Sequence, residues 1–337
     1  MTTKIPLITV LGSLNIDLVS YVSHHPLPGE TMTSNAFAVS PGGKGANQAV
    51  ACAKLSRSRT TSTSTSTSTS ADESAHIRML GAVGADSYGA LLTSNLASHG
   101  VDVSGVASSP SLKTGIAIIV VDEPTGQNRI ILSPEANHSL LPSSFAALPA
   151  PKPDLLIMQL EIPLPTVLAA LRAARDAGVP VLLNPAPAQR MPDDAYAGLA
   201  HLVVNETEAA VLGGVSEAEL DTEDGLERVA GGFLGLGVKN VIVTLGGRGV
   251  FYMAAAAGDG GARKQGLVPA EKAKVVDTTA AGDTFVGQYA LDVVGAGTGG
   301  AERFDIEAAV RRANRAAART VEKLGAQDSI PWRDELS

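Results

Sequence analysis

The sequence predicts an α/β protein, with a three-layer α/β/α sandwich around a mostly parallel sheet and a small β-sheet standing off it. Short β-branched runs alternate along the chain with longer Ala/Leu-rich segments, as in repeated β-α-β units. Most of these runs are apolar throughout, which suits strands that are covered by helices on both faces. Two regions, 19–39 and 113–132, break the rhythm and are the source of the small sheet.

The strands of the main sheet are predicted, in chain order, at residues 5–11, 77–83, 155–159, 179–183, 202–204 and 241–245. Helical patterns such as 166–177 and 224–236 lie between them. Ligands of such folds bind at the carboxyl ends of the strands. The residues that follow each run are therefore candidates for a site.

The two irregular regions have the pattern of extended segments joined by turns. Residues 115–121, 123–127 and 128–132 are predicted as strand, turn and strand. We expect a lid over a site, formed by about residues 13–40 and 107–138.

The remaining irregular segments are predicted to be loops. Residues 60–70 alternate Thr and Ser without an apolar residue, so the segment 57–75 is interpreted as a tolerated surface insertion. A phosphorylation cluster is the alternative interpretation. The glycine-rich stretches 258–261 and 295–300 are also predicted to be loops.

Composition excludes several classes of protein. The chain has 337 residues, 26 of them Lys or Arg and 34 Asp or Glu, which gives a net charge of −8. An acidic chain without a basic block is not expected to bind nucleic acid or an anionic membrane. The longest β-like apolar run, 116–121, is far shorter than the ~20 residues that span a bilayer. The single cysteine, Cys52, excludes an intrachain disulfide, and we expect a cytoplasmic protein.

The segment 277–285, Asp-Thr-Thr-Ala-Ala-Gly-Asp-Thr-Phe, is the strongest signal for chemistry. Its small residues Ala280, Ala281 and Gly282 allow a tight turn into a helix, whose first amides would form an anion hole. Asp283 follows on the first turn, where it could take a proton from a hydroxyl that attacks a bound phosphate. From this segment alone, Asp283 could equally be a helix cap.

Two further motifs offer groups for a polar ligand. In Pro-Gly-Gly-Lys-Gly-Ala-Asn-Gln-Ala, residues 41–49, the glycines allow close backbone approach while Lys44 and Asn47 supply donors. In Gly-Ser-Leu-Asn-Ile-Asp, Asn15 and Asp17 project to one side of an extended segment and suit sugar hydroxyls. The plainer interpretations are a helix-start turn with a solvated lysine and an Asn-x-Asp turn.

Three segments at predicted strand ends complete the set. Asn205 and Glu208 share one face of a starting helix, where they would hold Mg²⁺ through water or form an N-cap with a capping-box Glu. The turn Thr-Leu-Gly-Gly-Arg-Gly, 244–249, would cradle a nucleotide or simply join two strands. Glu161 is either a ligand-binding carboxylate or a solvated loop residue.

Together and in this order, these segments resemble the PfkB family of carbohydrate kinases, and within it the ribokinases. The resemblance extends from Gly12 to about Trp332. It is carried by Gly-Ser-Leu-Asn-Ile-Asp (12–17), Gly-Gly-Lys-Gly-Ala-Asn-Gln-Ala (42–49), Met-Gln-Leu-Glu (158–161), Asn-Pro-Ala-Pro-Ala (184–188), Asn-Glu-Thr-Glu (205–208) and Gly-Ala-Gln-Asp-Ser-Ile-Pro-Trp (325–332). It implies a single kinase domain over 1–337 with a ribokinase-like fold, and ATP-dependent phosphorylation of D-ribose at its 5-hydroxyl.

The resemblance also implies a role for individual residues, position by position. Asp283 would be the base that deprotonates the 5-hydroxyl, and the ribose would also be held by Asn15, Asp17, Gly43, Lys44, Asn47 and Glu161. The anion hole for the transferred phosphoryl group would be formed by Ala280, Ala281 and Gly282. The ATP site would be lined by Asn205, Thr244, Gly246, Gly247, Arg248, Gly249, Gly282 and Asn314.

Two kinds of metal ion are implied by the same resemblance. Mg²⁺ is linked to Asn205 and Glu208, through water. K⁺, as an activating monovalent cation, would bind beside the anion hole at Asp277, Thr279, Thr320, Lys323, Gly325 and Ser329, several of them through backbone carbonyls. A K⁺ ion there would orient the loop that makes the anion hole.

Other functions stay open. A related kinase could act on deoxyribose, fructose or adenosine, although a nucleoside base needs an aromatic surface and the expected lid offers Tyr21 and Phe37 alone. A non-catalytic sugar- or nucleotide-binding regulator would lack the base or the anion-hole glycine, and both are present. Two positions depart from the family: Gln288 replaces a small residue, and Asn314 stands where bacterial ribokinases tend to have His. By analogy we expect a homodimer formed through the lid.

Overall fold

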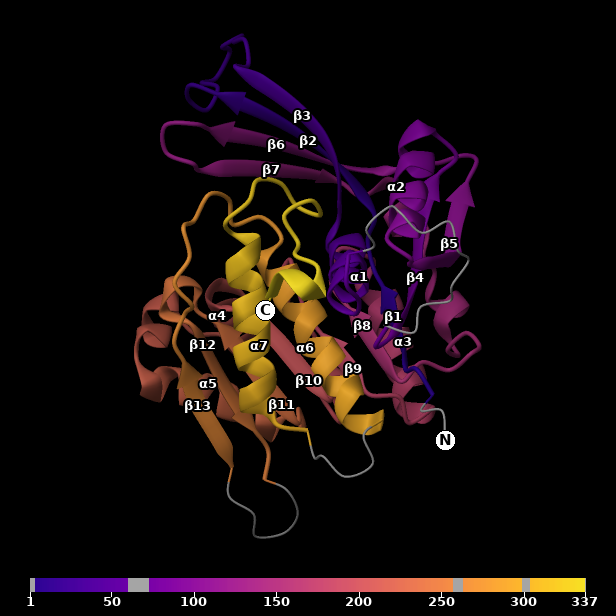
Figure 1. The fold of residues 1–337 in the computed structure, drawn as a ribbon, viewed down its shortest axis with the longest axis vertical. Helices are drawn as coiled ribbons and strands as arrows, with labels where there is room; N and C mark the ends of the chain where they lie inside the picture. Colours follow the sequence, from indigo (N-terminus) through magenta and orange to yellow (C-terminus); the bar gives the residue numbers. More distant parts are fainter. Residues whose placement is uncertain (1–3, 60–72, 257–262, 299–303, 337) are drawn as a thin grey trace.

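The computed structural model describes residues 4–59, 73–256, 263–298 and 304–336. In this part of the chain, nine strands form a main sheet and four form a smaller sheet that stands above it (Figure 1). The Thr/Ser run at 60–70 and the glycine-rich stretch 258–261 lie outside the described residues, so their predicted loops stay predictions.

The main sheet is parallel over most of its width. Its strands are β1 (Leu7–Leu11), β4 (His76–Gly84), β5 (Asp102–Ser109), β8 (Leu155–Met158), β9 (Val181–Leu183), β10 (His201–Asn205), β11 (Asn240–Thr244), β12 (Val250–Ala254) and β13 (Lys264–Val268). Their order across the sheet is β13-β12-β11-β10-β9-β8-β1-β4-β5. All pairs from β11 to β5 are parallel, whereas β12 is antiparallel to both neighbours. The predicted sheet is confirmed.

Helices cover both faces of this sheet. One face packs against α1 (Lys44–Leu55), α2 (Ser87–Ser98), α6 (Ala281–Thr298) and α7 (Ile306–Thr320). The other packs against α3 (Leu164–Asp176), α4 (Glu206–Gly213) and α5 (Glu223–Gly235). In Figure 1, α1, α6 and α7 lie in front of the sheet. Short 3₁₀ helices lie at Glu135–Ser139, Pro142–Phe145, Asp193–Ala195, Glu217–Asp221, Gly246–Arg248 and Arg333–Leu336.

The two layers of helices explain why the central strands are apolar throughout. In β8, Leu155 and Ile157 belong to the core under α1 and α6, whereas Leu156 and Met158 belong to the core under α3 and α5. All four side chains are fully buried. Burial of each such side chain contributes about 1.5–3 kcal/mol, so neither face of the strand tolerates a polar residue.

The smaller sheet has the order β3-β2-β6-β7. Its strands are β2 (Asn15–Val22), β3 (Ala36–Gly42), β6 (Gly115–Asp122) and β7 (Asn128–Ser133). The predicted strand, turn and strand over 115–132 are confirmed as β6 and β7. Asn15 is opposite Gly42 on one side and Gly115 on the other, so this end of the small sheet adjoins the carboxyl end of β1.

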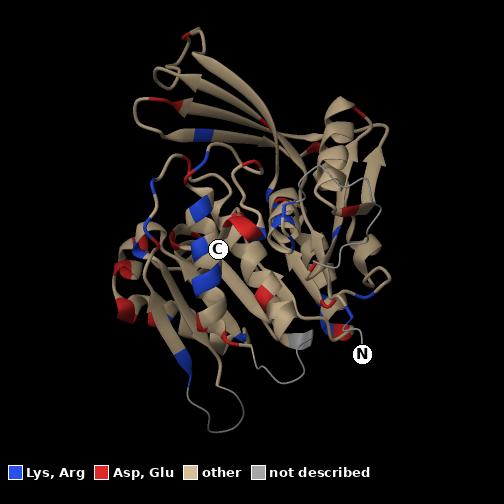
Figure 2. Ribbon diagram, in the orientation of Figure 1, with Lys and Arg blue, Asp and Glu red and all other residues tan. Residues whose placement is uncertain are grey.

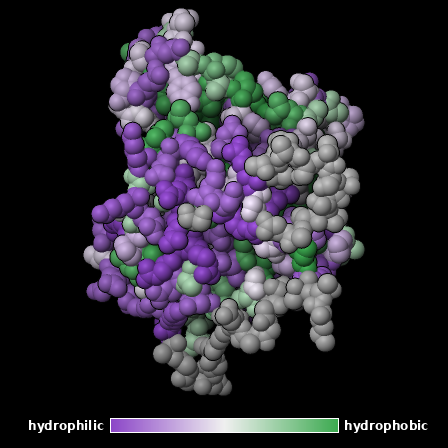
Figure 3. All heavy atoms as spheres, in the orientation of Figure 1, coloured by the Kyte–Doolittle hydropathy of each residue, from purple (hydrophilic) through white to green (hydrophobic). Residues whose placement is uncertain are grey.

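The small sheet exposes an apolar surface, which we call the apolar sheet surface. Its residues, each more than 40% exposed and on the same face by the strand register, are Phe37, Val39, Ile118 and Ile131. Figure 3 shows hydrophobic residues gathered over the small sheet, above a mostly hydrophilic face.

The prediction of a loop over 295–300 was wrong in its first part, because α6 continues to Thr298. A glycine in a helix costs about 1 kcal/mol relative to alanine. The preceding turn is anchored by the buried Leu291 and Val294, and this packing outweighs the low helix propensity of Gly295.

The most visible run of basic residues follows α7 (Figure 2). Three of its arginines are paired with carboxylates, in the pairs Arg311–Glu307, Arg312–Asp292 and Arg319–Glu322. Among the described residues, no helix has the length and apolar character needed to span a membrane.

Candidate active site

Two adjoining cavities lie at the carboxyl ends of the central strands. The larger has a volume of about 520 Å³ and the smaller about 210 Å³. Thr244, Thr278 and Gly282 line both of them. A ligand in one cavity can therefore meet a ligand in the other beside Gly282.

The N-terminal end of α6 forms the wall between the cavities. Ala280, which precedes the helix, has a φ of +60°, a left-handed conformation that costs about 1–2 kcal/mol for a non-glycine residue. A Cβ placed on Gly282 would meet no atom within 4 Å, so this backbone borders open space. Within the described residues, the amides of Gly282 and Asp283 donate to no protein acceptor. The turn thus presents free N–H groups to an anion.

The Asp283 carboxylate is held away from its own helix. It is 7% exposed, lines the smaller cavity, and accepts hydrogen bonds of 3.0 Å from Asn47 Nδ2 and Gln48 Nε2. Both donors belong to α1. The side chain therefore does not act as the helix cap that the sequence left open.

Glu161 anchors a polar cluster where β1 and β8 end. Its Oε2 accepts hydrogen bonds from Ser13 Oγ at 2.5 Å, from the Lys44 amide at 3.0 Å and from Asn15 Nδ2 at 3.4 Å. These contacts exclude the solvated-loop interpretation of Glu161. They join Glu161 to the segment after β1 and to the start of α1, each more than 100 residues away from Glu161 in the sequence.

Asp17 and two glycines lie at the base of the small sheet. A Cβ on Gly42 would lie 2.2 Å from Asp17 Oδ2, and Gly43, with φ +87°, would place a Cβ 2.7 Å from the Asn15 amide nitrogen. Gly43 therefore requires glycine, whereas a side chain at position 42 would displace the Asp17 carboxylate. Burial, with the Glu161 and Asp283 carboxylates, raises the pKa of Asp17 to about 7.

The Lys44 side chain lines the smaller cavity with Asp283 and Glu208. Burial opposes its charge, but the carboxylates of Asp283, Glu161 and Glu208 outweigh burial and raise the pKa of the ammonium above its ordinary value. Lys44 is therefore a charged donor at this position.

Asn205 and Glu208 form a capping box at the start of α4. Glu208 N donates to Asn205 Oδ1 at 2.7 Å, and Asn205 N donates to Glu208 Oε2 at 2.9 Å. Both residues also line the smaller cavity, so the two interpretations of this pair do not exclude each other. Burial raises the pKa of Glu208, although the Asn205 amide and Lys44 oppose the rise.

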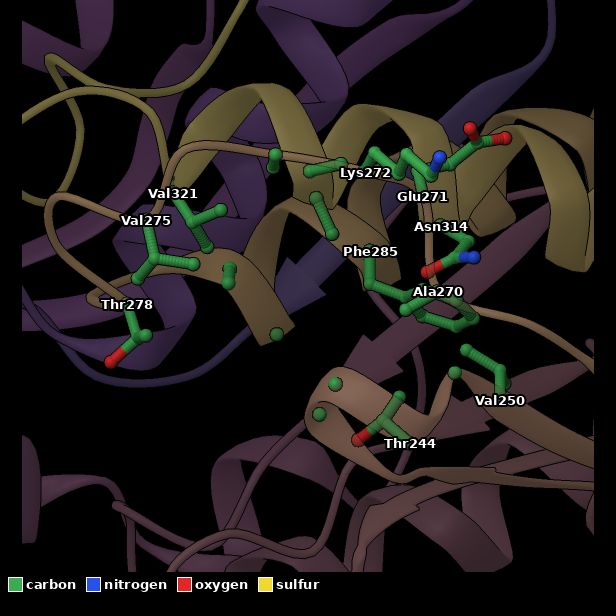
Figure 4. A pocket seen from close by; sticks show the side chains of 18 residues that line it. Thr244, Val250, Ala270, Glu271, Lys272, Val275, Thr278, Phe285, Asn314 and Val321 are labelled. Carbon is green, nitrogen blue, oxygen red and sulfur yellow. The ribbon is translucent and has the colours of Figure 1, made fainter.

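The larger cavity lies between the turn after β11 and the helices α6 and α7. In Figure 4, Thr244 and Val250 lie on one side of it, with Val275, Phe285 and Asn314 on the other. Gly246, Gly247, Gly249 and Gly282 also line it. Asn314 Nδ2 donates to the Pro269 carbonyl at 2.8 Å.

Arg248 is the one residue of the glycine turn, among those predicted, that does not line this cavity. Its guanidinium pairs with Glu206 and donates to the Leu220 carbonyl. Gly249 has a φ of +105°, and a Cβ there would lie 2.0 Å from the Val268 carbonyl oxygen, so the turn requires glycine at that position.

Two loops beside the anion hole meet through Asp277. Its Oδ1 accepts from Thr279 N at 2.9 Å and from Thr279 Oγ1 at 2.7 Å, while its Oδ2 accepts from Gly325 N at 2.9 Å. Three of the six residues predicted for a monovalent cation are thus in direct contact.

The other three make different contacts. Thr320 Oγ1 donates to Thr284 Oγ1 at 2.8 Å in the first turns of α6. The Lys323 ammonium faces Glu335 at 3.4 Å, and Ser329 Oγ donates to the Ala326 carbonyl at 2.7 Å. The resemblance assigns several of the six residues to a cation through their backbone carbonyls, which these side-chain contacts leave unchanged.

The sequence profile described as "pfkB family carbohydrate kinase" matches residues 6–333. The chain belongs to this family. Ribokinase from Schizosaccharomyces pombe is 40% identical over 329 residues, covering 96% of this chain and 94% of the relative. Deoxyribokinase from Salmonella typhi is 36% identical over 334 residues, covering 98% and 97%.

Solved structures of pfkB-type kinases agree with the fold. The structure of Arabidopsis thaliana ribokinase complexed with ribose and ATP has a TM-score of 0.80 at 28% identity, covering 99% of this chain and 98% of that one. The predicted ribokinase-like fold is confirmed. Similarity to curated ribokinases over nearly the whole chain supports a ribokinase phosphotransferase.

Several residues of this kinase site were not singled out from the sequence. Ser13, Gln48 and Asn184 lie inside the motifs that carry the family resemblance, and their polar side chains were the available signal. Asn137 lies outside every motif that the sequence analysis identified. It accepts from Leu14 N at 2.9 Å and donates to Asn15 Oδ1 at 2.8 Å, so it fixes Asn15 from a short 3₁₀ helix 122 residues away.

Proposed function

We propose that this kinase transfers the γ-phosphoryl group of ATP to the 5-hydroxyl of D-ribose, giving D-ribose 5-phosphate and ADP. The observation that carries the proposal is the position of Asp283. Its buried carboxylate borders the smaller cavity, one residue from the Gly282 backbone that both cavities share.

The acceptor sugar is proposed to bind among the polar groups at the base of the small sheet. The donors and acceptors for several hydroxyls are proposed to come from Asn15, Asp17, Lys44, Asn47 and Glu161, and the backbone of Gly43 is proposed to adjoin the sugar. Support comes from the Arabidopsis ribokinase structure, which was determined with ribose and ATP. Deoxyribose is the second candidate, since a deoxyribokinase is 36% identical to this chain.

In the proposed reaction, Asp283 takes the proton of the 5-hydroxyl as its oxygen attacks the γ-phosphorus. The new O5–P bond forms while the bond from the γ-phosphorus to the bridging oxygen breaks, and that oxygen leaves on ADP. The anion hole over residues 280–283, where the amides of Gly282 and Asp283 have no protein acceptor among the described residues, stabilises charge on the transferred group. Lys44, charged in the same cavity, adds a cation beside it.

ATP is proposed to occupy the larger cavity, with its phosphates over the glycine turn Thr244–Gly249 and its base near Asn314. A Cβ on Gly246 or Gly247 would meet no atom within 4 Å, which fits a turn whose backbone faces a ligand. Because Nδ2 of Asn314 is committed to Pro269, its Oδ1 is left as an acceptor, which suits the amino group of adenine. In this proposal Arg248 lies at the rim of the ATP site.

Two metal ions complete the proposal. Mg²⁺ would be held by Glu208 and Asn205 through water, because Glu208 Oε1 and the second lone pair of Asn205 Oδ1 are not used by the capping box. It would neutralise phosphate charge. K⁺ would be held at the loops of Asp277, Thr279, Thr320, Lys323, Gly325 and Ser329, where the Asp277–Gly325 bond already joins the two segments.

A coupled ADP-release assay over a panel of sugars and nucleosides tests the proposal. We expect D-ribose to have the highest kcat/KM, because the polar cluster matches its hydroxyls and lacks an aromatic platform. A tenfold or greater preference for deoxyribose, fructose or adenosine would overturn the ribose assignment and leave the kinase class intact. No ADP release with any acceptor would favour a non-catalytic regulator.

A further inference from the structure

The Asp283 carboxylate accepts hydrogen bonds from two neighbouring side-chain amides of α1. Its Oδ2 accepts from Asn47 Nδ2 and its Oδ1 from Gln48 Nε2, each at 3.0 Å. The helices α1 and α6 touch closely here, since a Cβ on Gly287 would lie 2.5 Å from the Ala51 Cβ. The carboxylate is fixed against α1, and its remaining lone pairs are left for the cavity.

These two amides are themselves fixed by amides from distant parts of the chain. Gln48 Oε1 accepts from Gln159 Nε2 at 2.6 Å, and Asn47 Oδ1 accepts from Gln327 Nε2 at 3.0 Å. An amide can turn by 180° with little change in shape, so its outer partner decides which end faces inward. Because Gln159 and Gln327 both donate to an amide oxygen, both N–H ends are aimed at Asp283.

Gln48 and Gln327 do not line either cavity. Gln48 is fully buried, and its second amide hydrogen is used by Asn184 Oδ1 at 3.0 Å, so its hydrogen-bonding capacity inside the protein is filled. Gln327 is also buried, and its Oε1 accepts from Asn95 Nδ2 at 2.6 Å. A bound sugar or nucleotide would meet Asp283 rather than either glutamine.

We infer that Gln48 is a positioning residue for phosphoryl transfer, because it orients the Asp283 carboxylate directly. Gln327 has the same role indirectly, because it orients Asn47, which in turn contacts Asp283. The inference rests on the proposed role of Asp283 as base. A base must direct one lone pair at the hydroxyl whose proton it takes. Gln48 supplies a hydrogen bond that fixes the rotation of the carboxylate.

The variant Gln48→Met removes both donors and keeps the side-chain volume. We expect kcat to fall about 10–100-fold, the usual effect of losing a hydrogen bond to a charged group, with KM for D-ribose and ATP within about threefold. Gln288→Met is the matched control. It removes an amide–carboxylate bond to Asp292 further along α6, the helix that carries Asp283, and should keep the wild-type kcat.

The variant Gln48→Glu should change the pH dependence of kcat, which a mere loss of packing would leave unchanged. It leaves an acceptor for Gln159 but places a second carboxylate against Asp283. Two buried carboxylates side by side share a proton at neutral pH. The acid limb of the kcat–pH profile should therefore move up by at least one pH unit. An unchanged profile would contradict a contact between Gln48 and the reacting base.

Asp283→Asn, measured alongside, separates this inference from the proposed function. If Asp283→Asn keeps the wild-type kcat, the base assignment is wrong. If it is inactive while Gln48→Met keeps the wild-type kcat, the positioning role is overturned and the base stands. In the double variant, Gln48→Met should cause no further loss, because no carboxylate is left to orient.

Thermal melts establish that each variant is folded. If the Gln48 variants do not fold, Gln327→Met decides the question, because it acts through Asn47 from the other side. We expect a 3–10-fold lower kcat with unchanged KM for both substrates. A wild-type kcat in folded Gln327→Met would overturn the positioning network.

Discussion

Asp283 carries the proposed chemistry, and its replacement by an amide isolates that role. Asp283→Asn keeps the size of the side chain but cannot accept a proton. A positioned base contributes about 10²–10⁴-fold, so we expect kcat to fall by that factor with ATP affinity little changed. Steady-state kinetics and nucleotide titration measure both quantities. A folded variant that retains more than a third of the wild-type kcat would leave electrostatics as the main catalytic effect.

Asp17 links the free energy of unfolding to pH. Its pKa is about 7 in the folded protein and 3.8 as the reference for the unfolded chain, so the folded state binds the extra proton between these values. The contribution of Asp17 to the free energy of unfolding is fully present below about pH 4. It is lost as pH rises to about 7, at up to about 1.4 kcal/mol per pH unit.

Asp17→Asn removes this dependence. Urea unfolding of the sugar-free protein at pH 5 and pH 8 should show the variant gaining stability relative to the wild type at the higher pH. The same difference at both pH values would mean that the Asp17 carboxyl titrates normally in the folded protein.

Single residues were predictable where a motif follows a strand. Asn15, Glu161 and Asp283 each come after a predicted strand or turn, and parallel strands end at one edge, so their convergence could be expected. The bond from Gln48 to Asp283 could not, because it depends on the contact of two helices 235 residues apart. The capping box shows another limit of prediction from sequence. Asn205 and Glu208 form the predicted cap, and the same pair also borders the cavity where Mg²⁺ is proposed to bind.

At the scale of elements, two loops govern the anion hole. The Asp277 side chain bonds Thr279 in its own loop and Gly325 in the C-terminal loop. A cation bound to carbonyls of both loops would hold the turn before α6 in place.

We therefore expect K⁺ to raise kcat well above the value in Na⁺ or Tris at constant ionic strength. The ADP-release assay in the three salts measures this effect. Equal rates in all three would remove the cation from the proposal.

Strands in the middle of the sheet were easier to predict than those at its edges. The central strands are buried on both faces and read as continuous apolar runs. The edge strands β5 and β13 carry exposed residues, such as Asp102 and Lys264, and were not predicted. Helix α6 was shortened in the prediction, because the glycines near its end have a low helix propensity that burial of the preceding turn overrides.

At the scale of the whole molecule, the apolar sheet surface gathers exposed apolar side chains from three strands on one face of the small sheet. Exposed apolar side chains clustered on one sheet are typical of an interface. We expect a homodimer formed through the small sheet. Light scattering coupled to size exclusion should give the mass of a dimer.

A charge within the apolar sheet surface tests this interface. Ile131→Asp should give a monomer, because burial of a carboxylate in an apolar interface is costly. Leu267→Asp, at an exposed position of β13 in the main sheet, is the control and should stay dimeric. A dimer that survives Ile131→Asp would place the interface elsewhere.

The two adjoining cavities also bear on stereochemistry. They meet at Gly282, and neither lining contains the imidazole or thiol of a residue that often carries phosphoryl groups. With the sugar held beside Asp283 and ATP in the larger cavity, as proposed, the attacking and leaving oxygens lie on opposite sides of phosphorus. A single direct displacement inverts the configuration of phosphorus, whereas passage through a phosphorylated side chain would retain it. ATP made chiral with oxygen isotopes at its γ-phosphorus should therefore yield a sugar phosphate of inverted handedness, readable by ³¹P NMR.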